Sequence, residues 1–398
     1  MLKDYKYTII ACFVGYISQA IVNNFVPLLF VLFQTSFSIS LEQLGLLTGL
    51  NFFVQLCIDL LAAKYVDRIG YRASIVMAHI CCALGFWLLT ILPNVLPPFM
   101  GLCIAVSVYA IGGGLIEVLI SPIMEACPNK EKDKAMSLLH SFYCWGHVGV
   151  VLCSTVFFGF IGIQHWRILA FGWSFIPLCN AYIFCKVPIS SLQSEGEVGM
   201  SISSLFKKSL FWILLILMIC AGACEQAISQ WTSTYAELTL HLPKEIGDLA
   251  GPLFFATMMG LSRLFYGKKG EKISLYRFML MSAMLCFVSY LMVGLNLIPL
   301  VELVGCGLAG LSVGILWPGT FSLASKYMPH GGTAMFALFA LGGDVGCALG
   351  PSFVGTAASL FGQQLSLGIL CATIFPTVLI IMLIILSRSL KHAKISIS

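Results

Sequence analysis

The stretch LFWILLILMICAGACEQAISQW (residues 210–231) places an acid and several amides directly after a long apolar run. The run is long enough to form a membrane span, because a helix needs about 20 residues to cross the hydrocarbon layer. Near the N-terminus, GYISQAIVNN (15–24) shares the pattern G-x-x-x-Q-A-I with GACEQAISQW (222–231), displaced by 207 positions (15 to 222). The pattern of an apolar helix with polar residues at mid-length thus occurs twice in the sequence, which predicts two related halves.

The composition of the 398-residue chain is that of a membrane protein. Hydrophobic residues make up 59% of it and charged residues only 10%, whereas a soluble domain is usually about 25% charged. In lipid every backbone polar group must be satisfied within its own segment, so continuous apolar runs predict α-helices. The alternating ten-residue strands of an outer-membrane barrel are not found. We therefore expect an all-α integral membrane protein.

The apolar runs predict twelve transmembrane helices in two pseudo-symmetric six-helix bundles. The spans lie near residues 8–33, 42–66, 73–94, 98–126, 134–163, 167–187, 210–236, 246–266, 275–295, 299–325, 332–361 and 364–386. A Ser-rich polar segment separates the halves, so we expect an N-terminal bundle at 1–188, a cytoplasmic linker at 189–209 and a C-terminal bundle at 210–398. Two parallel repeats of this kind predict a solute site between the halves.

The basic residues predict the orientation. With the N-terminus inside, the inner connections hold 20 of the 22 Lys and Arg residues, and only Arg167 and Lys244 lie outside. The positive-inside rule therefore predicts an inner (plasma) membrane protein with both termini cytoplasmic. The net charge of +5 is scattered over short loops and does not indicate nucleic-acid binding. The 16 cysteines lack the spacing of a zinc site or a disulfide framework, so we expect no metal and no cofactor.

Four acids lie deep in the predicted spans: Glu117, Glu225, Asp344 and Asp59. A charged side chain at the bilayer centre costs roughly 2.5–3.5 kcal/mol on insertion scales, so each acid should face a cavity, a partner or a proton. No Lys or Arg is expected at that depth, which favours protonatable carboxylates over buried ion pairs. We expect Glu117, Glu225 and Asp344 to take part in proton coupling, and Asp59 to be structural, near the inner gate. A structural clasp on hydroxyls or basic residues of neighbouring helices is the alternative for all four.

Amide, hydroxyl and aromatic side chains on the same spans are candidates for binding the solute. The candidates are Gln19, Asn23, Ser121, His140, Trp145, Gln226, Gln230, Trp231 and Trp317. Two histidines on one face of the fifth span do not make a metal site, and packing or hydrogen bonding explains them better. An aromatic face beside amides can hold a sugar ring, although membrane tryptophans also serve as packing and interface residues. Trp317 is preferred to Trp231 because WPG marks a helix discontinuity.

The predicted inner loop AKYVDRIGYR (63–72) contains Asp67, Arg68, Gly70 and Arg72. A carboxylate at a helix end, followed by basic residues and a turn glycine, can cap or pair with neighbouring helix termini. Such a clasp would exist in only one state of a moving bundle. The alternative is an ordinary basic loop that sets topology.

Twelve spans in two repeats, with D-R-x-G-x-R (67–72) between spans two and three, resemble the major facilitator superfamily. The loop motif of that superfamily begins with Gly where this chain has Ala63, and its last basic residue is here Ala73. GGGLIEVLISP (112–122) resembles the fourth span of the fucose–galactose–glucose proton symporters, and this resemblance implies a proton-coupling role for Glu117. W-P-x-x-F-S-L-A (317–324) resembles their tenth span.

The resemblance departs from the fucose permease at two positions. Where that protein has an Asp on the first span, four residues before a Pro, this chain has Asn23, and where it has an Asn on the fourth span, this chain has Ser121. The resemblance therefore implies the family and not fucose itself, and the proton stoichiometry stays open.

The leading hypothesis is a secondary active transporter that imports a small polar solute, such as a sugar, together with protons. Its two halves would rock about the central site, and the superfamily implies a monomer. A proton-driven exporter of drugs or metabolites is the alternative, although the Gly-Pro pair that such exporters carry on the fifth span lies here at Gly350-Pro351, on the eleventh. A sensor or an intramembrane enzyme is disfavoured, because the chain has no soluble domain and no H-E-x-x-H, G-x-S-x-G or P-loop motif.

Overall fold

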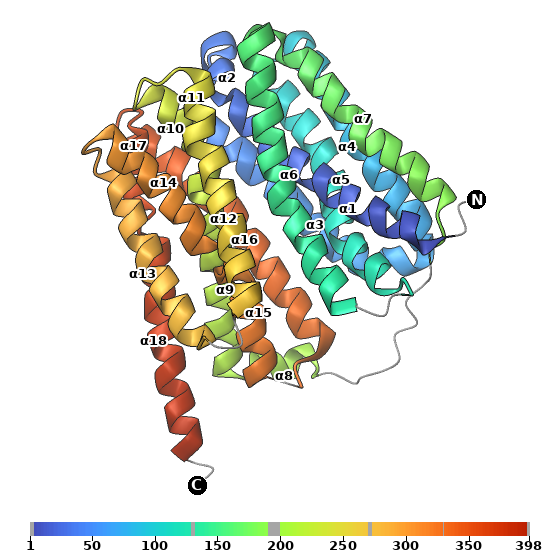
Figure 1. Ribbon diagram of the computed structural model, residues 1–398, viewed down its shortest axis with the longest axis vertical. Helices are drawn as coiled ribbons and strands as arrows, with labels where there is room; N and C mark the ends of the chain where they lie inside the picture. The colour runs from blue at the N-terminus through green and yellow to red at the C-terminus, as the bar shows by residue number, and fades with distance from the viewer. Residues whose placement is uncertain (1–3, 129–131, 190–199, 270–272, 329, 396–398) are drawn as a thin grey trace.

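The computed structural model describes residues 4–128, 132–189, 200–269, 273–328 and 330–395, and every regular element in them is a helix (Figure 1). The first half contains α1 (Tyr5–Asn24), η1 (Val26–Leu29), α2 (Phe30–Phe37), α3 (Leu41–Ile69), α4 (Tyr71–Val95), α5 (Pro98–Glu125), α6 (Lys132–Ile161), η2 (Ile163–His165) and α7 (Trp166–Lys186). The second half follows after α8 (Ile202–Phe206) with α9 (Ser209–Ser229), α10 (Thr232–Leu238), α11 (Lys244–Asp248), η3 (Leu249–Leu253), α12 (Phe254–Lys269), α13 (Leu275–Gly294), α14 (Pro299–Val313), α15 (Leu316–Tyr327), α16 (Gly332–Leu360), α17 (Leu365–Cys371) and α18 (Ile374–Ile395).

Eleven helical segments among the described residues are long and apolar enough to cross a membrane. The expected span at 246–266 corresponds to α11, η3 and α12, which follow one another without a break. This segment carries Lys244, Glu245, Asp248 and Arg263, which lower its hydropathy relative to the other spans. The chain is thus an all-α integral membrane protein. The eleven apolar spans and this less apolar segment together agree with the expected count of twelve.

Several spans are interrupted where the sequence provides a reason. In the first span α1 ends at Asn24 and the 3₁₀ turn η1, with Pro27 at its start, leads into α2. In the seventh span α9 ends at Ser229 and α10 begins at Thr232. These two breaks fall at the same place in the 207-residue repeat. They stop the helix where the polar residues of each repeat lie, so that the polar side chains of the two spans meet near the middle of the molecule.

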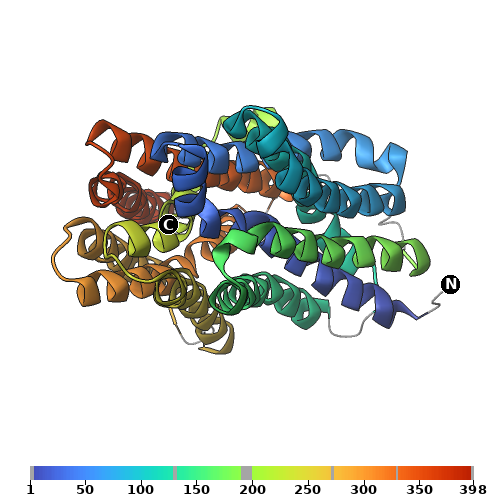
Figure 2. The same cartoon turned by 90° about the horizontal axis from the view of Figure 1, so that it is seen from above.

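The blue-to-green helices of the first half and the yellow-to-red helices of the second half form two bundles side by side (Figures 1 and 2). Glycines permit the closest helix approaches within each bundle. A Cβ atom on Gly112 of α5 would collide with the carbonyl oxygen of Ala78 in α4, and one on Gly346 of α16 would collide with the carbonyl oxygen of Ile219 in α9. The boundaries 1–188 and 210–398 for the bundles stay a prediction, and the described part of the expected linker includes α8.

Contacts between the bundles concentrate along α3 and α16 and at one end of the molecule. Ser352 Oγ of α16 donates to the carbonyl oxygen of Gly45 in α3 at 3.2 Å. A Cβ on Gly45 would lie 2.9 Å from the carbonyl oxygen of Pro351. At the same end Thr155 Oγ1 of α6 donates to Asp248 Oδ2 at 3.3 Å. The two halves are therefore joined firmly at this end, which we call the closed end.

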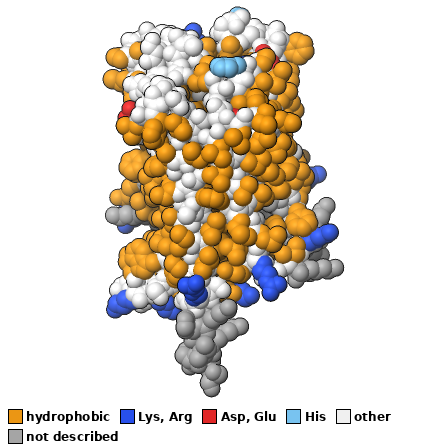
Figure 3. Space-filling model, turned by 90° about the vertical axis from the view of Figure 1, so that its left-hand side faces the viewer, with side chains coloured by type: hydrophobic (Ala, Val, Ile, Leu, Met, Phe, Trp, Pro, Cys, Tyr) orange, Lys and Arg blue, Asp and Glu red, His pale blue; other side chains and the backbone are white. Residues whose placement is uncertain are grey.

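The other end carries most of the positive charge. Because successive spans alternate in direction, the exposed residues Arg68, Lys186, Lys207, Lys208, Lys269, Lys326 and Arg388 all lie at helix ends on the same side. Figure 3 shows a broad hydrophobic surface over the middle of the molecule and Lys and Arg side chains gathered at its lower end. We call this the basic end. A belt of apolar surface above a basic rim is the pattern of a protein embedded in a bilayer.

Candidate functional site

A cavity of about 160 Å³ lies between the two bundles. Its lining comes in equal parts from both halves: Tyr16, Gln19, Asn23, Phe52, Glu117 and Tyr143 from the first, and Glu225, Gln226, Arg263, Trp317, Asp344 and Cys347 from the second. Seven residues expected to form the site thus line one cavity: Gln19, Asn23, Glu117, Glu225, Gln226, Trp317 and Asp344. Three of the four deep acids, Glu117, Glu225 and Asp344, thus line a common cavity instead of facing lipid.

The two repeated stretches meet at this cavity. Gln19 and Gln226 occupy the same position in the repeat, as do Asn23 and Gln230. Gln230 Nε2 donates to the backbone carbonyl oxygen of Asn23 at 3.2 Å, across the seam between the bundles. This carbonyl is available because α1 ends at Asn24, so that the last carbonyls of the helix have no intrahelical partner. The breaks in α1 and α9 therefore supply both the geometry and the backbone acceptor of the seam.

On the first-half wall, amides lead from Glu117 toward the seam. Gln19 Nε2 donates to Glu117 Oε2 and to Gln55 Oε1, both at 3.0 Å. Gln55 Nε2 donates in turn to Asn23 Oδ1 at 2.8 Å, and Asn51 Nδ2 donates to the same oxygen at 3.0 Å. The side-chain positions of Gln19 and Asn23 are thus fixed by other buried amides, as a preorganised polar wall requires.

The second-half wall continues this chain of hydrogen bonds. Gln230 Nε2 also donates to Gln226 Oε1 at 2.9 Å, and Gln226 Nε2 lies 3.4 Å from Glu225 Oε1. Arg263 Nη2 then lies 3.7 Å from Glu225 Oε2. A continuous polar path therefore joins Glu117 in the first half to Arg263 in the second, and it crosses the seam once, at Asn23 and Gln230.

Arg263 corrects one expectation. The sequence places it in an inner connection and predicts no basic residue at the depth of the acids, but its side chain lies in the cavity wall beside Glu225 and is 22% exposed. Its Nε also donates to the carbonyl oxygen of Gly314 at 3.3 Å. A long Arg side chain can carry its charge several ångströms from its own backbone. Span boundaries predicted from hydropathy do not take this reach into account. Glu225 is therefore ion-paired, whereas no ion pair is seen for Glu117 or Asp344 in the described part of the chain.

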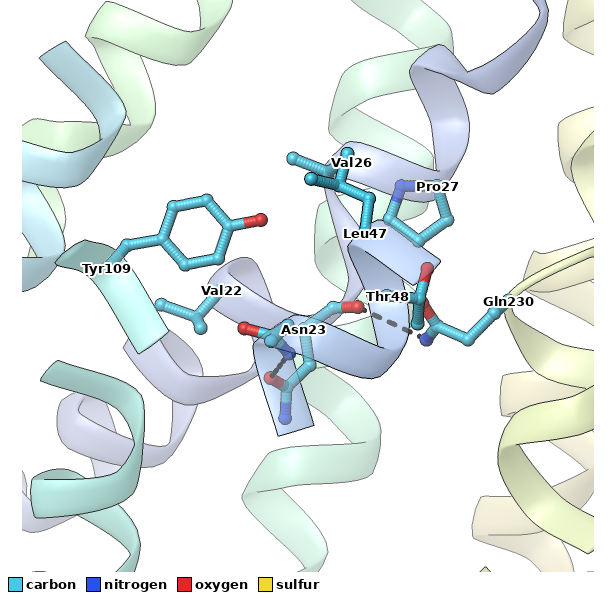
Figure 4. A pocket seen from close by; sticks show the side chains of 9 residues that line it. Val22, Asn23, Val26, Pro27, Leu47, Thr48, Tyr109 and Gln230 are labelled. Carbon is cyan, nitrogen blue, oxygen red and sulfur yellow. Dashed lines mark hydrogen bonds between the residues drawn. The ribbon is translucent and has the colours of Figure 1, made fainter. Parts of the chain in front are cut away.

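A second, smaller space of about 10 Å³ adjoins the seam on the side of the closed end, and it has room for about one water molecule. Its lining includes Asn23, Pro27, Thr48, Tyr109 and Gln230. Figure 4 shows Gln230 reaching from the second half to Asn23, with the hydrogen bond between them drawn as a dashed line. This narrow space lies between the seam and the packed closed end.

Three further candidates lie outside the cavity lining. Ser121 Oγ lies 3.0 Å from the hydroxyl oxygen of Tyr16, a lining residue, so that Ser121 supports the wall from behind. Trp231 is fully buried, with its ring 5.2 Å from that of Phe30 and its Nε1 donating to a backbone carbonyl at 3.1 Å. Trp145 is 42% exposed. The positions of Trp231 and Trp145 therefore differ from the expectation: the first packs at the closed end, and the second faces outward.

The inner loop holds the end of α7. Arg72 Nη1 and Nη2 donate to the carbonyl oxygens of Phe184 and Val187, at 2.6 and 2.8 Å, and so cap the end of α7. Gly70 has a φ of 92°, which lets the chain end α3 and start α4 without a linker. Arg68 is exposed. The side chains of Asp67 and His140 lie outside the described residues.

Sequence reasoning missed Tyr16, Phe52, Tyr143 and Cys347 in the lining, and it missed that Asn51 and Gln55 continue a line of polar residues with Asp59 behind it. A signal for the latter exists: Asn51, Gln55 and Asp59 are four residues apart on the second span, so they share one face of α3. A polar stripe on an otherwise apolar helix indicates the face that turns away from lipid. The aromatic and thiol side chains carry no comparable signal, because such residues occur equally on lipid-facing surfaces.

The family follows from a sequence comparison over most of the chain. A model of the Major Facilitator Superfamily matches residues 8–351. The chain belongs to the major facilitator superfamily. It is therefore a multi-pass membrane transporter and not an enzyme, as the sequence predicts. No curated protein sequence matches the chain.

Solved structures with the same fold include several superfamily transporters. A bacterial homologue of the human lysosomal transporter Spinster, in an inward-facing and occupied conformation, has a TM-score of 0.77 at 15% identity, over 96% of this chain and 97% of that one. A D-xylose–proton symporter has a TM-score of 0.78 at 13% identity, with the same coverage. The Escherichia coli fucose:proton symporter, as a variant with one substitution, has a TM-score of 0.66 at 16% identity, over 96% and 99%. At these identities the comparison shows the fold alone.

Proposed function

We propose that this superfamily member imports a small polar solute, such as a sugar, together with protons, by alternating access of its two bundles. The observation that carries the proposal is the cavity at the seam, where Glu117, for which no ion pair is seen among the described residues, is linked by amides to the opposite wall. In transporters of this kind the solute site lies near the membrane midplane, between the repeats. Two transporters of the same fold are named as sugar–proton symporters, and this also supports the proposal.

The cavity wall suits a solute with several hydroxyl groups. Gln19, Asn23 and Gln226 present amides, each able to donate and to accept. Trp317 and Phe52 add apolar ring surface, against which the C–H face of a sugar ring packs well. We propose that Gln19, Asn23, Gln226 and Trp317 contact the solute, and that Gln230 and Ser121 hold this wall in place.

Glu117 would couple the proton to the solute through Gln19. Because Gln19 Nε2 already donates to Glu117, a change of charge on the carboxylate alters the position and strength of the amide that faces the cavity. The Gln19 Oε1 atom is buried without a partner, so a solute hydroxyl could donate to it. Protonation of Glu117 and solute binding would thus act on the same side chain, which is what linkage between two ligands requires.

The direction of transport depends on which end faces the cytoplasm. We propose that the basic end is cytoplasmic and that both termini lie there, in the cytoplasmic (inner) membrane, because Lys and Arg are retained on that side. The contacts at the closed end, among them the hydrogen bond from Thr155 to Asp248, would then seal the outer side. These contacts must break when the cavity opens outward, while the bundles at 1–188 and 210–398 move as units joined by the linker at 189–209.

The test is solute accumulation in proteoliposomes under an imposed proton gradient, after a thermal-shift screen of sugars, nucleosides and organic acids has supplied a ligand. We expect the wild type to concentrate the ligand when the outside is acidic. Glu117→Gln should lose accumulation but keep solute exchange at equal concentrations, because only the proton step is removed. Glu42→Gln, an exposed acid at the start of α3, is the matched control. Accumulation by Glu117→Gln would refute the coupling role, and proton-driven loss of ligand from the vesicles would indicate the exporter.

A further inference from the structure

The polar stripe of α3 ends at a residue that the proposed mechanism does not use. Asn51 and Gln55 both hydrogen-bond to Asn23, whereas Asp59 lies one turn beyond them, toward the basic end. Asp59 lies opposite α16, the main contact of α3 in the second half, and its side chain meets Asp344 there in hydrogen-bonding contact. Two acids from different bundles thus touch at the seam.

The pair is largely shielded from water, with Asp59 partly buried, and no ion pair to either acid is seen among the described residues. Asp344 is only 4% exposed. No amide, hydroxyl or basic group of the described residues donates to its Oδ2 or to the Oδ1 of Asp59, and both atoms are buried. An ionised carboxylate can only accept hydrogen bonds, so a hydrogen bond between two carboxyl groups needs one proton. Without that proton, two like charges would face each other in a site with little water, where their repulsion is strong.

Among the described residues, no positive charge near the pair replaces the proton. Around the pair, the titratable side chains described are Glu117 on α5, Glu225 on α9 and Cys347 on α16. Arg263 on α12 pairs with Glu225. On α4, Arg72 and His79 are occupied by contacts with α7. Arg68 on α3 and Lys326 on α15 are exposed. The described parts of α8 and α17 hold no Asp, Glu, Lys, Arg or His.

We propose that Asp59 and Asp344 form a second proton-binding site, in which one shared proton joins α3 of the first bundle to α16 of the second. This site is separate from Glu117, which lies on α5 and contacts Gln19. With the proton bound, the two helices are held together below the cavity, toward the basic end. When the proton leaves, the repulsion between the carboxylates favours separation of the bundles there. Opening of the cavity toward the basic end would therefore release a proton from the seam.

The role of this site in coupling rests on the proposed function, but the site itself can be tested without solute or gradient. Spin labels on noncanonical amino acids at Ile69 of α3 and Phe336 of α16, both exposed, lie roughly 12–15 Å beyond the pair along their helices. Double electron–electron resonance then measures the distance between the two labels. The protein is held in nanodiscs, and the pH is varied from about pH 5 to about pH 8. The variants are Asp59→Asn and Asp344→Asn, with Glu42→Gln, the exposed acid at the start of α3, as the matched acid-to-amide control.

One linked proton changes the ratio of separated to joined helices about tenfold per pH unit. We therefore expect the longer distance to become more populated in the wild type and in Glu42→Gln as the pH rises. Each Asp→Asn variant should keep one distance distribution at all pH values, because its amide donates to the remaining carboxylate without a proton. A wild-type distribution that does not change with pH, or Asp→Asn variants that keep the wild-type change, would overturn the proposal.

A second measurement covers the case in which one variant does not fold. In the Glu117→Gln background, infrared spectra of the wild-type pair should show the carbonyl stretch of a protonated carboxylic acid at neutral pH. Asp59→Asn alone should abolish the part of this band that belongs to the pair. An unchanged band in that variant would show that the two acids do not share a proton, whether or not the protein transports anything.

Discussion

Replacement of Arg263 by Met should destabilise the protein, because it leaves Glu225 in the cavity wall without its cation. The two groups lie 3.7 Å apart, and Coulomb's law with an effective dielectric constant of about 20 gives about 4.5 kcal/mol for unit charges at that distance. Arg263 is 22% exposed, so water screens part of this attraction. We expect a coupling free energy of about 2–4 kcal/mol, in the range found when one partner of a buried pair is removed.

A double-mutant cycle isolates this coupling from the loss of the Arg side chain itself. The four proteins are the wild type, Arg263→Met, Glu225→Gln and the double variant, and the measurement is reversible unfolding by SDS in mixed micelles. The double variant should recover most of the stability that Arg263→Met loses, because no charge is then left unpaired. Arg263→Lys, which keeps the charge, should cost less than Arg263→Met. A coupling free energy below about 0.5 kcal/mol, the scatter of additive sites, would refute the ion pair.

Three further predictions test the packing and the lining. Gly346→Ala places a Cβ on a carbonyl oxygen of α9 and should cost about 1–3 kcal/mol in the same unfolding assay, while Gly149→Ala, with open space around it, should have little effect. Trp317→Ala should raise the KM for transport, because it removes ring surface from the cavity. Trp231→Ala should instead lower the free energy of unfolding by about 3–5 kcal/mol, because this ring is buried in packing outside the cavity.

The sequence was most informative where polar residues interrupt the apolar helices. Asn23, Glu117 and Glu225 could be placed at the seam because a polar group in a membrane helix is strongly disfavoured on the lipid side. Apolar and aromatic residues give no such guidance, since lipid is as apolar as the protein interior. The sequence therefore could not tell that Trp145 faces outward and Trp231 packs at the closed end.

Arg263 was missed for a different reason. Hydropathy locates a span to within several residues, and a basic residue near the predicted end of a span is assigned to the adjoining loop. In the structure Arg263 lies within α12, six residues before its last residue, Lys269. Its partner Glu225 lies on α9, and nothing in one sequence shows which residues of two separate helices meet. The polar pattern predicted which side chains enter the cavity, but the pairing among them had to come from the structure.

The polar path from Glu117 to Arg263 leads to a last prediction, because it crosses the seam only at the hydrogen bond between Gln230 and Asn23. Gln230→Leu removes both this bond and the donation to Gln226, but it leaves the acids and the lining amides in place. If protonation in the first half acts on the solute through this path, the variant should bind solute with a Kd that depends less on pH than that of the wild type. The wild-type change would be up to about tenfold per pH unit for one linked proton.

The measurement is solute binding by isothermal calorimetry at several pH values, with Gln164→Leu, an exposed glutamine at the closed end, as the matched control. The control should keep the wild-type pH dependence. If Gln230→Leu also kept it, Glu117 would have to act on the solute directly across the cavity, without the path through the seam. If the variant lost affinity equally at every pH, Gln230 would serve only to shape the wall, and coupling between the halves would have to pass through another contact, of which Asp59 with Asp344 is the next to test.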